Sequence, residues 1–164
     1  MSKLVEIKNL HVEATTDSGR RIEIIKGVDI EIAKGEIVAL IGESGSGKTT
    51  IALTLMGYTR PGCRISEGAL LIDGKDMATL SERERTKVRG TEVAYVPQSA
   101  AAAFNPSQTI MDQVIEVTRI HGLMSPDKAR QRAIELFKAL SLPSPETIGE
   151  RYPHQVSGGQ LQRL

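Results

Sequence analysis

Residues 42–49 have the types and spacing of a loop that binds the phosphates of a nucleotide. Gly42 is followed by four residues and then by Gly47, Lys48 and Thr49, which matches the pattern of such loops. Glycines let the backbone curl so that successive N–H groups point at a phosphate, and the lysine ammonium faces the β and γ oxygens. The sequence therefore predicts a nucleotide site formed by Gly42, Glu43, Ser44, Gly45, Ser46, Gly47, Lys48, Thr49 and Thr50, with the Thr49 hydroxyl as a ligand of Mg²⁺.

A second group of residues suited to anions lies close to the last residue of the sequence. Ser157, Gly158, Gly159 and Gln160 stand where a helix can begin, so that a hydroxyl and exposed backbone N–H groups face one point. A loop followed by an ordinary capped helix has the same residue pattern. These four residues alone leave both interpretations open.

The phosphate loop needs a strand before it and a helix after it. Residues 37–41 form a continuous apolar run, which is typical of a strand buried on both faces. The run is followed, after the loop, by residues 50–56, which we expect to form a helix that Gly57 ends. This context favours a nucleotide site over a flexible glycine- and serine-rich loop.

The remaining elements follow from hydrophobic periodicity. Residues 4–12 and 22–32 alternate as strands around a turn at 16–19, and 69–72 and 93–96 are further short strands. Residues 81–89 predict a charged, solvated helix. From residue 106 to 140 the pattern is helical, with Ser125 as an N-cap and Pro126 in the first turn. The apolar face expected there consists of Ala129, Ala133, Leu136, Phe137 and Leu140.

Length and composition exclude several classes of protein. The chain has 164 residues and a formal net charge of +1, with no tryptophan and 3% aromatic residues. This balance argues against nonspecific nucleic-acid binding, and we expect no nucleic-acid partner. The single cysteine, Cys63, cannot form an internal disulfide, and neither a signal peptide nor an apolar run long enough to span a membrane is recognisable. We therefore expect a cytoplasmic location.

Nucleotide hydrolysis needs an acidic residue beyond the phosphate loop. Asp73 follows an apolar strand, but Gly74 comes next, and Asp-Gly is typical of a hairpin turn. A turn is the favoured interpretation and a metal ligand the alternative. The guanine-recognition pattern Asn-Lys-x-Asp is absent, which argues against a GTPase. A phosphotransferase is a further alternative, although nothing in such an enzyme requires Ser-Gly-Gly-Gln.

Taken in this order, the two glycine-containing motifs resemble those of ATP-binding cassette (ABC) ATPases, whose signature is usually Leu-Ser-Gly-Gly-Gln. The resemblance covers the whole chain and places Gln98 in the Q-loop, as a contact to Mg²⁺ and water and hence a catalytic residue. Residues 42–48, 104–106 and 152–155 are similar to the dipeptide/oligopeptide/nickel importer group.

The resemblance implies an α/β fold of the P-loop NTPase type, with an N-terminal antiparallel β subdomain and an α-helical subdomain. It places the ATP-binding core at 1–105 and the helical subdomain at 106–164. It implies ATP and Mg²⁺ as ligands and a homo- or heterodimer of ATPase subunits, in which the signature acts on the partner's ATP. Two permease subunits and a substrate-binding protein would hold the ATPase peripherally at the cytoplasmic face of the inner membrane during uptake of peptides or related small solutes.

Three departures from the family pattern qualify these expectations. Val156 replaces the usual leucine, which should leave the helix start intact. Ala14 stands about where the family stacks adenine on an aromatic residue, and no aromatic residue precedes Tyr58, which predicts loose nucleotide selectivity. The sequence stops at Leu164, so we expect a chain truncated after the signature, without the Walker B acidic pair and with the C-terminal part of the core missing. Such a chain should bind nucleotide weakly, hydrolyse it little and have marginal stability. The alternatives are an ABC ATPase of translation or DNA repair and a non-functional remnant.

Overall fold

The computed structural model describes residues 3–164 and divides into two compact units. Unit 1 is Met1–Tyr95 and unit 2 is Val96–Leu164. The boundary between the two units thus lies between Tyr95 and Val96, before Gln98. The sequence predicted a domain boundary after residue 105, and that boundary stays a prediction.

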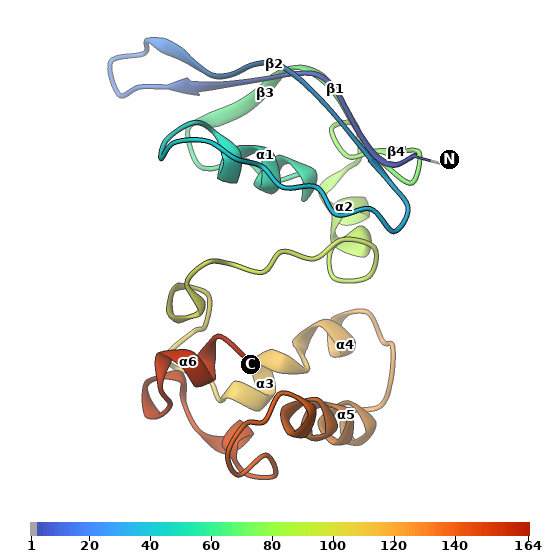
Figure 1. Cartoon of the computed structure of the whole chain (residues 1–164), viewed down its shortest axis with the longest axis vertical. Coiled ribbons are helices and arrows are strands. Elements are labelled where there is room, and N and C mark those ends of the chain that lie inside the picture. The colour runs from blue at the N-terminus through green and yellow to red at the C-terminus, as the bar shows by residue number, and fades with distance from the viewer. Residues whose placement is uncertain (1–2) are drawn as a thin grey trace. The chain divides into compact units, whose positions relative to one another are not determined.

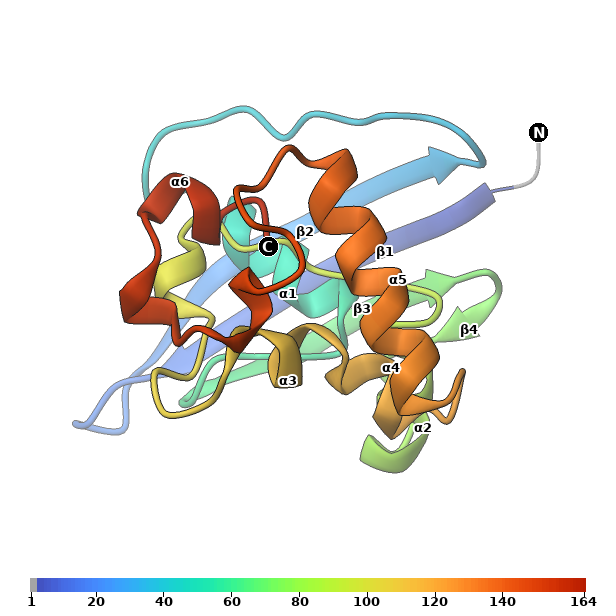
Figure 2. The ribbon, with the colours of Figure 1, turned by 90° about the horizontal axis from the view of Figure 1, so that it is seen from below.

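Unit 1 is built on a four-stranded antiparallel sheet in the order β2-β1-β3-β4 (Figures 1 and 2). Apolar side chains that alternate along β1, β2 and β3 point to one face, where they pack against α1 and form a core. The elements are β1 (Lys3–Thr15), β2 (Arg21–Ala33), α1 (Lys48–Leu55), β3 (Cys63–Ile72), β4 (Lys75–Asp76) and α2 (Glu82–Val88). The buried core residues are Ile7, Leu10, Val12, Ile25, Ile51, Leu70, Ile72, Met77 and Val88. The predicted N-terminal hairpin and the strand at 69–72 are confirmed.

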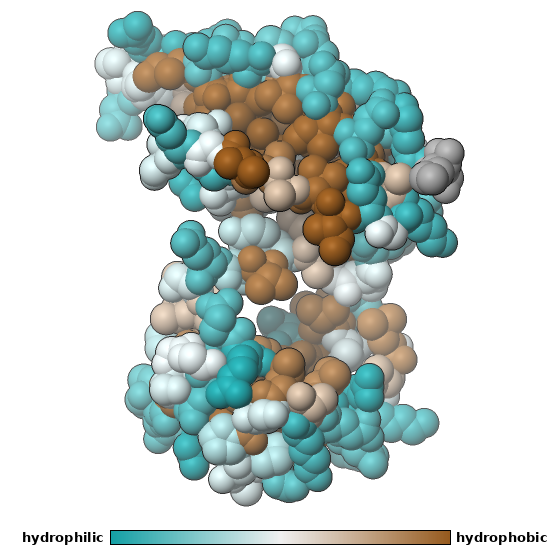
Figure 3. Space-filling model, in the orientation of Figure 1, coloured by the Kyte–Doolittle hydropathy of each residue, from teal (hydrophilic) through white to brown (hydrophobic). Residues whose placement is uncertain are grey.

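Two predicted strands are wrong. Residues 37–41 are coil, with Ile37 96% and Ile41 94% exposed. Residues 93–96 form only one isolated bridge, between Arg89 and Val93. A strand buried on both faces needs neighbours that supply ladder hydrogen bonds and cover its side chains, and within residues 3–164 no strand of the sheet lies beside either segment. Figure 3 shows apolar side chains gathered on the side of unit 1 where the 37–41 segment passes α1.

Unit 2 is helical and packs around its own core. Its helices are α3 (Ile110–Val114), α4 (Glu116–Ile120), α5 (Pro126–Ala139) and α6 (Gly158–Leu161), with 3₁₀ turns η1 (Ala100–Ala102), η2 (Ile148–Glu150) and η3 (Pro153–Gln155). The core consists of Met111, Ala133, Phe137, Leu142 and Ile148. Ser125 and Pro126 begin α5 as predicted, and Ala129, Ala133 and Phe137 are buried. Leu136 and Leu140 are exposed, so the buried face is narrower than predicted. No helix in residues 3–164 combines the length and hydropathy that a bilayer crossing needs.

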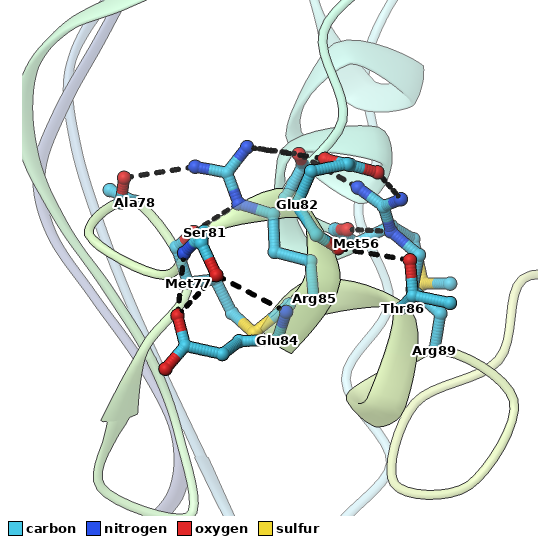
Figure 4. Close-up of polar contacts among 10 residues, drawn as sticks. Met56, Met77, Ala78, Ser81, Glu82, Glu84, Arg85, Thr86 and Arg89 are labelled. Atoms are coloured by element: carbon cyan, nitrogen blue, oxygen red, sulfur yellow. Dashed lines mark hydrogen bonds and ion pairs between the residues drawn. The ribbon is translucent and has the colours of Figure 1, made fainter.

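The C-terminal end of α1 is held by Arg85 of α2 and by Arg89, which directly follows α2 (Figure 4). Arg85 donates to the carbonyl oxygens of Met77 at 2.9 Å, Ala78 at 3.0 Å and Gly57 at 3.3 Å. Arg89 donates to Met56 at 2.7 Å and to Gly57 at 3.1 Å. The last carbonyls of a helix lack intrahelical donors and carry partial negative charge, so cations stabilise them. The sequence predicted a helix in solvent at residues 81–89. The helix forms, but the side chains of Arg85 and Arg89 are half-buried, so the predicted exposure is wrong for these two residues.

Helix α2 itself begins with a capping box. The Ser81 hydroxyl accepts from the Glu84 N–H, and the Glu84 carboxylate accepts from the Ser81 N–H at 2.8 Å. The Ser81 hydroxyl also donates to this carboxylate, and these bonds hold the pKa of Glu84 below its ordinary value. The start of α2, and hence the position of Arg85 one turn later, is therefore set by a local hydrogen-bond pair.

We expect the substitution Arg85→Met to lower the free energy of unfolding by about 2–4 kcal/mol, because three carbonyls lose a charged donor. Arg83→Met is the matched control, since Arg83 lies exposed on the same helix and should change stability by less than about 0.5 kcal/mol. Urea titrations of both variants measure the difference. Equal stabilities would show that Arg85 does not hold α1.

Candidate functional site

The Lys48 ammonium lies inside the loop formed by residues 42–47. Its Nζ donates to the carbonyl oxygen of Gly42 at 2.8 Å, to that of Glu43 at 2.6 Å, and to the Ser46 hydroxyl at 3.3 Å. Lys48 and Gly47 are half-buried, while residues 42–46 of the loop are exposed. The loop thus wraps around a fixed positive charge at the start of α1, as the spacing of the motif predicts.

Two glycines give this loop its curvature. Gly45 and Gly47 have φ angles of +85° and +93°, a region that side-chain-bearing residues rarely adopt. At Gly47 space is also limiting, since an added Cβ would lie 2.4 Å from Cδ1 of Ile25 in the core. Gly47 therefore brings the start of α1 directly against β2, and a larger residue would displace the loop.

The electrostatics of the loop favour an anion. The first N–H groups of α1 have no intrahelical acceptors and carry the positive end of the helix dipole. The first turn of α1 contains no acidic residue. The Thr49 hydroxyl, on this first turn, is the type of hard oxygen ligand that Mg²⁺ prefers. In chemistry and conformation, these residues fit a bound triphosphate with Mg²⁺.

The second predicted motif is a capped helix start in unit 2. The Ser157 hydroxyl accepts from the Gln160 N–H at 3.3 Å, and the Gln160 side-chain oxygen accepts from the Ser157 N–H at 2.9 Å. Gly158 and Gly159 are exposed, and a Cβ on either would meet open space. Val156 packs against the core of unit 2, so the helix start is intact with valine at this position. The arrangement is a capped helix whose glycines leave the backbone accessible.

Gln162 connects this helix to the segment that contains Gln98. Its side-chain nitrogen donates to the Pro97 carbonyl at 3.2 Å, and its side-chain oxygen accepts from the Ala100 N–H at 3.1 Å. Gln98 lies between these two anchor points, exposed in a bend. The predicted Q-loop and the predicted signature are therefore joined within unit 2, by a residue to which the sequence analysis gave no role. A second glutamine two positions after Gln160 of the signature was the hint in the sequence.

The predicted residues fall into two groups. The residues of the phosphate loop are brought together in unit 1, and Gln98, Ser157, Gly158, Gly159 and Gln160 belong to unit 2. Asp73 has a φ of +47° and forms the two-residue turn between β3 and β4 with Gly74, which confirms the hairpin interpretation. Within the described part of the chain, no cluster of three or more His, Cys, Asp or Glu side chains could hold a metal ion.

Comparison with known proteins places these motifs in context. A family model described as ABC transporter matches residues 25–164. The oligopeptide transport ATP-binding protein AppD of Bacillus subtilis (strain 168) is 39% identical over 165 residues, which cover 100% of this chain and 50% of AppD. The metal-staphylopine import system ATP-binding protein CntD of Staphylococcus aureus (strain Mu50 / ATCC 700699) is 36% identical over 98% of this chain and 58% of CntD. The chain thus spans about half the length of these relatives.

A solved structure is similar in fold. It is the dimeric post-hydrolysis state of the ATP-binding cassette MJ0796 bound to ADP and Pi, with a TM-score of 0.79 and 29% sequence identity. The similarity covers 97% of this chain and 66% of that chain. The predicted fold class, a P-loop NTPase core with antiparallel β and helical parts, is confirmed by this likeness.

Replacing Gln162 tests its link to the Gln98 segment. In Gln162→Leu the Ala100 amide loses its acceptor, and we expect its hydrogen exchange to accelerate about fivefold, as for one lost hydrogen bond. Gln162→Glu keeps an acceptor oxygen and should preserve the protection of Ala100. Gln131→Leu, at an exposed position of α5, is the control. Unchanged exchange in Gln162→Leu would contradict the link.

Proposed function

Because the chain belongs to the ABC transporter family, we propose that it binds ATP at residues 42–50 as part of the ATP-binding subunit of an importer. One observation carries this proposal: the Lys48 ammonium is held inside a glycine-rich loop at the positive end of α1. Such an arrangement can meet a triphosphate with a fixed cation and with backbone N–H groups at the same time.

Each residue of the loop has a distinct proposed role. Lys48 would leave the carbonyl oxygens of Gly42 and Glu43 to pair with phosphate oxygens, which are stronger acceptors because they are charged. Thr49 would hold Mg²⁺, which neutralises phosphate charge when bound. Gly45 and Gly47 would let the backbone amides approach the phosphates closely.

The second group of residues supports the coupling role of the subunit. We propose that Ser157, Gly158, Gly159 and Gln160 meet the ATP of a partner subunit, since the exposed glycine backbone and the serine hydroxyl are suited to an anion. Gln98, as proposed from the family resemblance, would contact Mg²⁺ and water. This arrangement requires a dimer of ATPase subunits, which could be homo- or heteromeric.

The importer assignment rests on the relatives. Since AppD is named for oligopeptide transport and CntD for metal-staphylopine import, we propose uptake of peptides or a related small solute. Two membrane-spanning permeases and a substrate-binding protein would then be the partners, and the subunit would associate peripherally with the cytoplasmic face of the membrane through the permeases. Nucleic acid is not a proposed partner, in keeping with the net charge of +1.

Titration of the 164-residue chain with Mg-ATP tests the binding site. We expect Lys48→Ala to weaken binding by about ten- to a hundredfold, because a charge-assisted contact to phosphate is lost. Lys34→Ala removes an exposed lysine of the same unit and should bind as the native chain does. Similar affinities for the Lys48 and Lys34 variants would refute the proposed site.

Hydrolysis by these 164 residues alone should be negligible. Asp73 lies in a hairpin turn, and we assign no other residue of this sequence as the catalytic carboxylate that hydrolysis requires. Phosphate release from Mg-ATP is the measurement, with Lys48→Ala as the background. Turnover that depends on Mg²⁺ and disappears in Lys48→Ala would show that the 164 residues contain a complete catalytic site.

A further inference from the structure

A pocket of about 340 Å³ lies against β3 in unit 1, with walls that come from residues 57–85. It is therefore separate from the phosphate loop, and its volume is within the range of sites that hold small molecules. Arg64 and Glu67 of β3 bring charges of opposite sign to it. We propose that the pocket binds a short peptide with free termini, the peptide carboxylate at Arg64 and the peptide ammonium at Glu67. This inference goes beyond the proposed function and does not depend on nucleotide binding.

The two charged side chains are anchored to different residues of β1. Arg64 donates from Nη2 to Oε2 of Glu13 at 2.9 Å, and Oε1 of Glu67 accepts from the side-chain amide of Asn9 at 2.7 Å. A guanidinium has five N–H donors and a carboxylate has about four acceptor positions. Arg64 and Glu67 are also exposed, so each keeps groups that a ligand can reach.

A bulge in β3 explains how both side chains reach one pocket. Residues three apart on a regular strand point to opposite faces. The pairing with β1 shifts between His11–Glu67 and Val12–Ile65, which gives β3 one extra residue at this point. Such a bulge redirects the side chains that follow it. Arg64 and Glu67 can therefore line the same wall.

The separation of the charges favours a peptide over a single amino acid. Three positions of an extended strand span about 10 Å, which is the distance along β3 from Arg64 to Glu67. A single amino acid has its ammonium and carboxylate on one carbon atom and cannot reach both side chains. A peptide of three residues, when extended, spans about 10 Å as well.

The wall between the two charges has a fixed shape. Gly68 has a φ of +103°, and a Cβ there would lie 2.5 Å from the carbonyl oxygen of Asn9 and 2.6 Å from that of Lys8. Only glycine allows β3 to approach β1 so closely. The pocket is thus built by a local irregularity in both strands, and such features are common beside functional sites.

The remaining polar groups suit the backbone of a peptide. The hydroxyls of Thr59 and Ser66 line the pocket, and a hydroxyl can both donate to a peptide carbonyl and accept from a peptide N–H. Arg85 supplies a second guanidinium, which the carbonyls of Met77 and Ala78 hold in place (Figure 4). These groups can satisfy the middle of a bound peptide while its ends meet Arg64 and Glu67.

Three probes separate the two ends of the ligand: trialanine, N-acetyl-trialanine without the ammonium, and trialanine amide without the carboxylate. Calorimetric titration of the 164-residue chain at pH 7, where a peptide amino group is mostly charged, measures their affinities. We expect trialanine to bind about tenfold more tightly than either blocked peptide, since each loses one charge-assisted contact. Alanine should bind more weakly than trialanine.

Two variants assign the ends. Glu67→Gln should weaken trialanine about tenfold and change N-acetyl-trialanine by less than about twofold. Arg64→Met should weaken both of these peptides and leave trialanine amide unchanged. Arg64→Met should still fold, because an exposed ion pair such as that with Glu13 contributes little to stability. Glu31→Gln and Arg60→Met are the matched controls, since both residues are exposed in unit 1 and lie outside the pocket wall.

The proposal is overturned if trialanine does not bind at millimolar concentration, or if all three probes bind equally well. Binding of inorganic phosphate in place of trialanine would also overturn it, because the pocket would then be a simple anion site. Equal losses in the control variants would show that the contacts lie elsewhere. A chain that binds Mg-ATP but not trialanine loses this inference alone, and a chain that binds trialanine but not Mg-ATP loses only the proposed function.

Discussion

Helix α1 must be held at both of its ends, and the arrangement of unit 1 depends on this constraint. At its start, Gly47 brings the backbone against Ile25 of the core, so the positive end of the helix faces the loop. At its end, the carbonyls of Met56 and Gly57 accept hydrogen bonds from Arg85 of α2 and from Arg89, which follows α2. A helix end with unpaired carbonyl oxygens and partial negative charge tends to fray, and the two arginines supply the donors that oppose this.

The phosphate loop satisfies its own polar groups. The Lys48 ammonium takes the carbonyl oxygens of Gly42 and Glu43 as acceptors, and the loop is thereby closed around the charge. A phosphate bound to Lys48, as proposed above, would replace these hydrogen bonds, and its net contribution would be the difference between charged and neutral acceptors. The same hydrogen bonds hold the loop in one conformation. A loop that is already ordered loses less conformational entropy when an anion binds.

Short-range patterns in the sequence were sufficient for much of this architecture. The curled glycine loop around Lys48, the Asp73–Gly74 hairpin turn and the start of α5 at Ser125 depend on residues within a few positions of one another, and the structure has each of these local conformations. The strand predicted at 37–41 is not formed. Its apolar composition is compatible with a buried strand, but a strand exists only where neighbours complete its hydrogen bonds, and the sheet within residues 3–164 provides none there.

The sequence by itself determined which residues are of a type and spacing that could meet a phosphate, because a glycine loop with Lys48 and a serine-glycine helix start are defined by spacing along the chain. Only the tertiary structure decided what holds these motifs in place. The contacts of Arg85 with Gly57 and of Gln162 with Pro97 join residues 28 and 65 positions apart. Such pairs form when folding brings side chains close to backbone groups that are distant along the chain, and no local pattern records which carbonyl each side chain will reach.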